Sequence, residues 1–262
     1  MTTRRFFIIF GLVGLFSGTA IMPASAQLAA PALRHGEGVR IAAALSNRDR
    51  PEADRAADAN RKPAGLLAFA GVGRGMNVAD IMPGQGYFTR IFSNLVGAGG
   101  HVWAVVPAAR LAQNPRAADA VKAIAADASF GNVTALVQKL DALSFPKPLD
   151  LAWTSQNYHD VYYGAGPDAA LALDKAVFAS LRRGGTFMVV DHVANPGMTL
   201  DAVRKLHRID PAIIRQQVEA AGFQFEGESK LLANPADSHT LTVFDPSIRG
   251  HTDQVVLKFR KP

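Results

Sequence analysis

The feature that most constrains the fold is a short apolar run followed by a tight turn with two glycines. The run at 78–81 contains Asp80, the turn contains Gly84 and Gly86, and a helix-like pattern begins at Tyr87. Glycine has no Cβ, so a ligand can approach the backbone closely at this turn. A strand, a turn and a helix N-terminus in this order form the nucleotide-binding corner of α/β proteins. The sequence therefore predicts a site for an adenosine-containing molecule.

Strand-like and helix-like segments alternate through most of the chain. The expected strands are 76–81, 101–106, 133–138, 149–154 and 186–191. The expected helices are 87–96, 117–126, 169–181 and 210–221. Strands separated by helices require right-handed crossovers and form a mostly parallel sheet. Three further runs, 223–232, 240–244 and 254–260, have no helix between them and predict an antiparallel edge.

The first 26 residues have the pattern of a cleavable export signal. Arg4 and Arg5 precede a strongly apolar stretch at 6–16, and small residues occupy 24–26. A membrane-spanning helix is disfavoured because glycines and Pro23 interrupt the segment. We expect a periplasmic or secreted protein with no stable membrane span after cleavage. The arginine pair also resembles a twin-arginine signal, so that route and the ordinary secretory route both stay open.

Charge and cysteine content narrow the partners. The chain carries a net charge of +6, and removal of residues 1–26 takes away two arginines and no acid, which leaves +4. The charges are scattered and form no aromatic–basic stripe, so we expect no nucleic-acid partner. We expect a small-molecule substrate, and an anionic substrate or a membrane surface remains open. The absence of cysteine excludes disulfides and thiolate chemistry.

The region before residue 65 predicts an N-terminal tail and a helical lid over 27–64. Residues 46–63 are dense in alternating charge. One interpretation is a solvated helix with side-chain ion pairs at i, i+3 and i, i+4. This explains the final Arg61-Lys62-Pro63 less well, because two cations end the helix just before the core. The second interpretation is therefore a lid over a substrate.

The order of elements resembles the class I S-adenosylmethionine-dependent methyltransferases, over about residues 65–262. Three turns fit this fold: the glycine turn, Arg183-Gly184-Gly185 and Ala220-Ala221-Gly222-Phe223. The resemblance implies a Rossmann-like α/β fold with a mostly parallel seven-stranded sheet and an antiparallel C-terminal edge. It also implies S-adenosylmethionine as the cofactor.

Several short motifs also resemble a family of exported bacterial proteins that are predicted to be methyltransferases. These motifs are Asp49-Arg50-Pro51, Arg61-Lys62-Pro63, Asn157-Tyr158-His159-Asp160, Leu206-His207-Arg208-Ile209-Asp210, and Asn234-Pro235-Ala236-Asp237 with His239. The family label rests on the fold, which does not by itself define a function.

Two positions depart from the usual cofactor motif. Met82 replaces the first glycine of the turn, and Val106 stands where the second strand commonly ends in an acidic residue that holds the ribose hydroxyls. An apolar side chain supplies no acceptor for those hydroxyls. Either the cofactor binds in a modified way, or the pocket has lost it. The expected cofactor-binding residues are Asp80, Met82, Gly84, Gly86, Asp141 and Asn157.

The segment after the fourth strand carries the candidate catalytic residues. His159 is the candidate base, because its reference pKa is near neutral and it follows a strand whose carboxyl end faces the crevice. Asp160 is expected to orient it, and the ring of Tyr158 to cover a ligand. An ordinary buried or surface histidine is the competing interpretation. Asp191 and His192 follow the fifth strand and are expected at the same crevice.

Three functional hypotheses follow. The first is an exported methyltransferase that acts on a small or envelope-associated acceptor. The second is a non-catalytic small-molecule-binding module, suggested by Met82 and Val106. The third is a metal-assisted enzyme that uses His159 and His192, with His207 and His239 as further histidines, although the sequence contains no tight ligand spacing and we assign no metal ligands.

Overall fold

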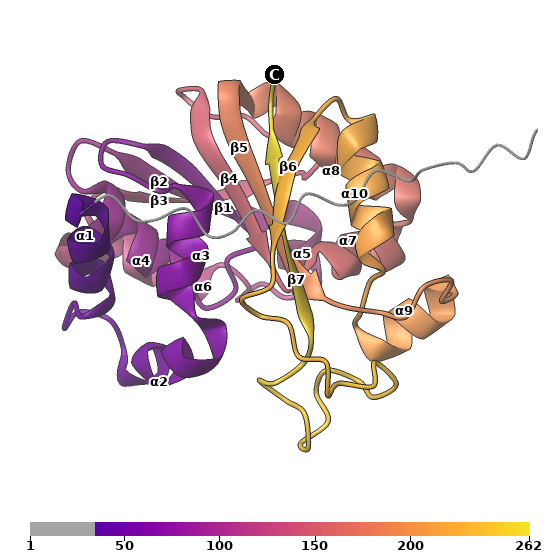
Figure 1. Ribbon diagram of the computed structural model, residues 1–262. Helices are drawn as coiled ribbons and strands as arrows, with labels where there is room; N and C mark the ends of the chain where they lie inside the picture. Colours follow the sequence, from indigo (N-terminus) through magenta and orange to yellow (C-terminus); the bar gives the residue numbers. More distant parts are fainter. Residues whose placement is uncertain (1–34) are drawn as a thin grey trace, which may run out of the picture.

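The computed structural model describes residues 35–262 (Figure 1). The predicted signal at 1–26 and the start of the predicted tail lie outside the described residues. Among the helices of residues 35–262, none combines the length and the apolar character needed to span a bilayer.

A seven-stranded sheet forms the centre of the molecule, in the order β3-β2-β1-β4-β5-β7-β6. Its strands are β1 (Asn77–Ile81), β2 (His101–Pro107), β3 (Val133–Gln138), β4 (Leu149–Ser155), β5 (Leu181–His192), β6 (Gln224–Ser229) and β7 (Gln254–Arg260). Strands β1 to β5 pair in parallel, and β7 pairs antiparallel with both β5 and β6. The predicted fold class is confirmed.

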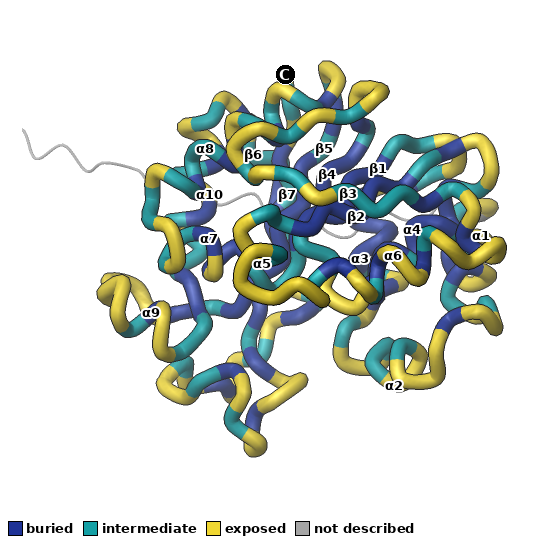
Figure 2. The backbone as a smooth tube through the Cα atoms, turned by 180° about the vertical axis from the view of Figure 1, so that it is seen from behind, coloured by how far each residue is buried: buried dark blue, intermediate teal, exposed yellow. Residues whose placement is uncertain are grey.

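Helices cover both faces of the sheet (Figure 1). They are α1 (His35–Leu45), α2 (Glu52–Arg61), α3 (Pro63–Ala70), α4 (Tyr87–Val96), α5 (Ala108–Gln113), α6 (Asp119–Ala126), α7 (Tyr158–Ala165), α8 (Pro167–Ser180), α9 (Leu200–Leu206) and α10 (Pro211–Ala220), with a short 3-10 turn, η1 (Ala128–Phe130). Successive residues of a strand face opposite sides. Accordingly, Val78 packs with α1, α3 and α4, and Ala79 packs with α7, α8 and α10. The strands are the most buried part of the backbone (Figure 2).

Segments near the carboxyl end of the sheet differ most from the sequence prediction. Residues 240–244 form no strand, and a coil of turns spans 230–253 between β6 and β7. At the opposite end of the sheet, the predicted turn at 183–185 lies within β5, which begins at Leu181. Gly184 has φ 71°, and the pairing with β4 is irregular between Leu181 and Thr186. Helices α5, α7 and α9 were not predicted. Each of these three helices has only six to eight residues, which is too short for a clear hydrophobic period.

The N-terminal helices are part of the main core. Ile41 of α1 and Leu66 of α3 are buried in the same cluster as Phe92 of α4. The domain boundary predicted between 64 and 65 falls inside α3. In contrast, α2 has no buried residue and lies beyond the carboxyl end of the sheet (Figure 1).

Candidate functional site

An open cleft of about 1530 Å³ lies at the carboxyl ends of β1, β2, β4 and β5. This confirms the predicted crevice of a parallel sheet. In Figures 1 and 2, α2 and the 230–253 coil project from this end of the sheet. Both contribute to the cleft, through Asp54, Ala57 and Arg61 of α2 and through Val243 and Phe244 of the coil.

The β1–α4 turn opens directly into the cleft. Gly84 has φ +57°, and no atom lies within 4 Å of the position that a Cβ would take there. Gly86 has φ +79° and begins α4, and a Cβ at this residue would collide with Ile124. Gly84 is therefore open toward a ligand, whereas Gly86 is favoured by its positive φ and by its close packing against Ile124.

Met82 adopts the left-handed backbone conformation, with φ 59°, where the usual motif has glycine. Its N–H donates to the Val105 carbonyl at 2.9 Å, and its carbonyl accepts from Asn157 Nδ2 at 2.8 Å. The Met82 side chain packs against the core cluster that contains Ile81. Met82, Gly84 and Val106 all line this cleft, so open space remains beside the Met82 side chain.

Asp80 is a buried carboxyl group at the base of the cleft. Its Oδ2 accepts from Thr89 Oγ1 at 2.6 Å. Burial raises the pKa of Asp80 to about 7, although the Thr89 hydrogen bond and the charge of Arg61 oppose this shift. Near neutral pH, this carboxyl group can therefore exist in either protonation state.

His159 lies in the first turn of α7 and is held by the carboxylate of Asp191 at the end of β5. The imidazole Nδ1 is 2.7 Å from Asp191 Oδ1, and the His159 main-chain N–H donates to Asp191 Oδ2 at 2.8 Å. Burial alone would lower the pKa of His159, but the charge and hydrogen bond of Asp191 outweigh it and raise the pKa. The imidazole lines the cleft with its orientation fixed.

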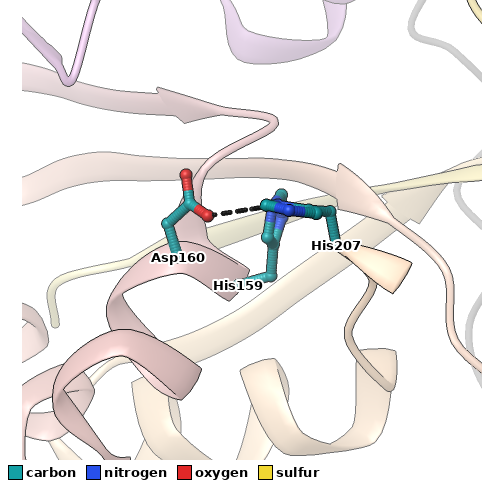
Figure 3. Close-up of side chains that lie close together, drawn as sticks. All are labelled: His159, Asp160 and His207. Atoms are coloured by element: carbon teal, nitrogen blue, oxygen red, sulfur yellow. Dashed lines mark ion pairs between the residues drawn. The ribbon is translucent and has the colours of Figure 1, made fainter. Parts of the chain in front are cut away.

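A second polar group lies beside this imidazole (Figure 3). Asp160 Oδ1 is 3.4 Å from His159 Nε2 and 3.5 Å from His207 Nδ1. The Tyr163 hydroxyl donates to Asp160 and lies 2.8 Å from His207 Nδ1. His207 ends α9 in the left-handed conformation, with φ 55°. The predicted orienting residue, Asp160, thus contacts Nε2, and Asp191 contacts Nδ1.

Of the remaining predicted site residues, Asn157 lines the cleft, and Tyr158 and Asp141 do not. Asn157 lines the cleft and links Met82 to Thr154 of β4. The Tyr158 ring is fully buried, its hydroxyl donates to Asp174, and it does not line the cleft, which corrects the expectation that it covers a ligand. Asp141 is exposed and does not line the cleft either, so its position supplies no cofactor contact.

Two other histidines have structural partners. His192 lines the cleft, its Nδ1 lies 2.7 Å from Thr252 Oγ1, and burial lowers its pKa to about 4. His239 lies 2.9 Å from Asp253. Arg208 makes two hydrogen bonds to Asp237, at 2.9 and 3.1 Å, so its guanidinium is held in an internal ion pair.

Sequence reasoning did not identify Tyr163 and Phe244 as cleft residues, and it did not pair Gln156 with Arg61. Tyr163 follows His159 by four residues, so helical spacing in α7 could have indicated it. Phe244 lies in a coil, and no periodic signal locates it. Gln156 has φ 63°, an unusual conformation for a residue other than glycine that no sequence pattern reveals.

No family model matches the chain, and no curated protein matches it. Solved structures match its fold. A SAM-dependent methyltransferase from Aquifex aeolicus is 14% identical with a TM-score of 0.54, over 86% of this chain and 98% of that one. The cyclase SpnF is 15% identical with a TM-score of 0.57, over 83% and 85%. A possible exported protein from Bordetella parapertussis is 16% identical with a TM-score of 0.51, over 86% and 79%. The chain has the class I methyltransferase fold.

Proposed function

We propose that this protein is an exported S-adenosylmethionine-dependent methyltransferase. The observation that carries the proposal is the β1–α4 turn, in which Gly84 faces open space inside the cleft. Open backbone at a helix N-terminus of this fold suits an adenosyl ligand. The match to a SAM-dependent methyltransferase supports it.

The residues of the cleft fit the proposed cofactor. Val106 offers no acceptor for ribose hydroxyls, but Gln113, Asn114 and Asp119 follow β2 and line the same cleft. Asn157 fixes the carbonyl of Met82 and thereby the path of the turn. S-adenosylmethionine supplies a methyl group on a positively charged sulfur. The protein must position an acceptor, exclude water and accept a proton where the acceptor carries one.

We assign the proton-accepting role to His159. Asp191 hydrogen-bonds Nδ1, which favours the tautomer with a proton on Nδ1 and a lone pair on Nε2. Asp160 lies on the Nε2 side and, with Tyr163, forms a polar wall for the acceptor. The acceptor is a small or envelope-associated molecule. Because S-adenosylmethionine is made in the cytoplasm, export of a folded, loaded chain would bring one equivalent.

Calorimetric titration of the protein lacking residues 1–26 tests the proposal. We expect S-adenosylmethionine and S-adenosylhomocysteine to bind, and Gly84→Ala to weaken both because its methyl group occupies open cleft space. Gly71→Ala is the matched control, since Gly71 has φ +73°, equally open surroundings and no place in the cleft. Absence of binding at millimolar ligand would end the proposal. Binding without methyl transfer to any envelope extract would favour the non-catalytic module.

One observation favours a metal-assisted enzyme as the second candidate. Among residues 35–262, ligand atoms of His159, Asp160 and His207 lie within 4.8 Å of one another (Figure 3). A carboxylate on the far nitrogen of a histidine, as Asp191 provides, is also common behind metal ligands. The geometry thus favours His207 over His192 as the partner of His159. Elemental analysis of untagged protein decides, because a three-ligand site retains its metal. Less than a tenth of an equivalent of any transition metal would contradict it.

A further inference from the structure

Three arginine side chains near the cleft end of the sheet differ in their partners: Arg50 and Arg208 are buried, and Arg61 is half-buried. Arg50 makes two hydrogen bonds to Asp58, at 2.9 and 2.6 Å, and Arg208 makes two to Asp237. Among residues 35–262, Arg61 has no carboxylate within ion-pair distance. Partial burial removes water from the Arg61 guanidinium and lowers its pKa, and an anionic ligand would compensate for this loss of hydration.

The Arg61 guanidinium is held in place by contacts that leave most of its donors free. Its Cζ lies 4.4 Å from the centroid of the Tyr87 ring. Its Nη2 donates to Gln156 Oε1 at 2.9 Å, the only hydrogen bond of this side chain within residues 35–262. A guanidinium has five N–H donors, and stacking on an aromatic face leaves their edge accessible. Arg61 lines the cleft, so this edge is available to a ligand.

The elements that carry Arg61 are themselves fixed. Tyr87 donates its hydroxyl to Asp58 Oδ1 at 2.6 Å, and Arg90 pairs with Asp54 at 3.0 Å, so α2 is pinned to the start of α4. Gln156 is fixed by Gln254, which accepts from its Nε2 at 2.9 Å. The guanidinium therefore has a defined position before any ligand binds.

An acidic side chain, Asp80, lines the same cleft as the Arg61 cation. Asp80 is buried, its only side-chain hydrogen bond within residues 35–262 is with Thr89, and the charge of Arg61 acts on it. A cation and an acid that are not bonded to each other complement a ligand with both charges. The α-amino-acid end of a molecule carries an ammonium and a carboxylate on one carbon.

We propose that Arg61, stacked on Tyr87 and held by Gln156, binds the carboxylate of the amino-acid end of the methyl donor, with Asp80 beside the ammonium group. This inference rests on the proposed function. It gives α2 a role in cofactor binding at the β1 end of the cleft, through its last residue, Arg61. A carboxylate on the acceptor is the other source of the same chemistry, and the test separates the two.

The test is a double-mutant cycle between protein and ligand. S-adenosylhomocysteine and its decarboxylated analogue are each titrated into wild type and Arg61→Ala. We expect wild type to favour the carboxylated compound by about tenfold or more, as for a charge-assisted, forked contact. Arg61→Ala should lose this preference and bind the decarboxylated analogue within about threefold of wild type. Arg61→Lys should recover only part of the preference because it lacks the fork.

Arg110→Ala is the matched control, since Arg110 is exposed, lines the cleft from α5 and should not affect the preference. Arg61→Met keeps the apolar stem on Tyr87 and guards against a folding defect, which thermal melts check. If Arg61→Ala weakens the binding of both compounds equally, or of neither, the assignment is overturned. Unchanged binding of both compounds would leave an acceptor carboxylate as the ligand of Arg61. If wild type binds neither compound, the proposed function itself fails.

Discussion

The two ends of the cleft handle buried charge in opposite ways. At the β4–β5 end, His159 and Asp191 are bonded to each other, which lowers the pKa of Asp191 against its burial and raises that of the imidazole. At the β1 end, Asp80 and Arg61 are not bonded, and burial leaves the carboxyl pKa near 7. The ion pair of His159 and Asp191 orients the imidazole Nε2, as a proton acceptor requires. Arg61 and Asp80 have no ion-pair partner within the described part of the chain, residues 35–262, so both can gain one from a bound ligand.

The largest expected effect separates chemistry from binding. His159→Gln removes the proposed base, and Asp191→Asn removes the group that fixes its tautomer. We expect each to reduce methyl transfer by about 10²- to 10⁴-fold, the usual contribution of a general base. The affinity for S-adenosylhomocysteine should stay within about threefold. The readout is radiolabel transfer into an envelope extract beside calorimetry.

Asn157→Ala provides the contrast, because it alters the turn through Met82 and should weaken binding instead. If His159→Gln transfers methyl groups at the wild-type rate, His159 is an ordinary buried histidine. The β4–β5 end of the cleft would then have no assigned chemical role.

The next largest effect concerns Asp80, the buried acid that has no ion-pair partner among the described residues. Asp80→Asn should weaken S-adenosylhomocysteine by about tenfold while it stabilises the ligand-free protein at pH 8. The folded pKa of about 7 lies above the ordinary 3.8, so the folded state binds the proton more tightly than the unfolded state. Wild type therefore loses stability as pH rises from about 4 to 7, and the variant does not. At 1.36 kcal/mol per pKa unit, the difference above pH 7 is at most about 4 kcal/mol.

Asp174→Asn is the matched control for this prediction. Asp174 is also buried, its pKa is raised to about 8, and it does not line the cleft. This variant should be stabilised at high pH with unchanged ligand affinity. Chemical denaturation of both variants across pH measures the effect. Equal ligand affinity in Asp80→Asn and wild type would remove Asp80 from the binding site.

The sequence was sufficient for the β1 end of the cleft because its signals are local. Strand, turn and helix follow one another within residues 77–96, and the glycines mark the turn. The β4–β5 end depends on pairing across the sheet. Ser155 is in register with Val190, which places Asp191 beside the start of α7. Asp160 was chosen as the orienting group because it adjoins His159 in sequence, but the pairing of parallel strands decides which carboxylate meets Nδ1.

The rest of the site could not be derived from pattern. His207 precedes the expected helix at 210–221 and Phe244 ends the expected edge strand at 240–244, and neither segment has a period that fixes the position of these residues. Arg61 was recognised as unusual because two cations end its helix. Its partner Gln156 lies 95 residues away, a pairing that only the folded chain determines.

The pH dependence of methyl transfer sharpens the comparison at the chemical end. A base must be deprotonated, so the rate should fall as pH falls through the pKa of His159. Because Asp191 raises this pKa, the midpoint of the acid limb should lie above the 6.5 of an unperturbed histidine. In Asp191→Asn the residual activity should show a lower midpoint. A wild-type midpoint below 6.5 would indicate that His159 does not titrate in the rate-limiting step.

The smallest effect on activity is expected at Phe244, beside His207, at the end of the cleft where we place the methyl acceptor. Phe244 is 56% exposed, and its ring lies 4.8 Å from that of His207. Because a half-exposed ring contributes only part of its transfer free energy, Phe244→Ala should raise the extract concentration for half-maximal rate by about two- to fivefold. Leu241→Ala is the control, since Leu241 is 40% exposed in the same coil but does not line the cleft. A larger loss of cofactor affinity than of acceptor affinity in Phe244→Ala would mean that the coil serves the cofactor, and the two ends of the cleft would no longer have separate tasks.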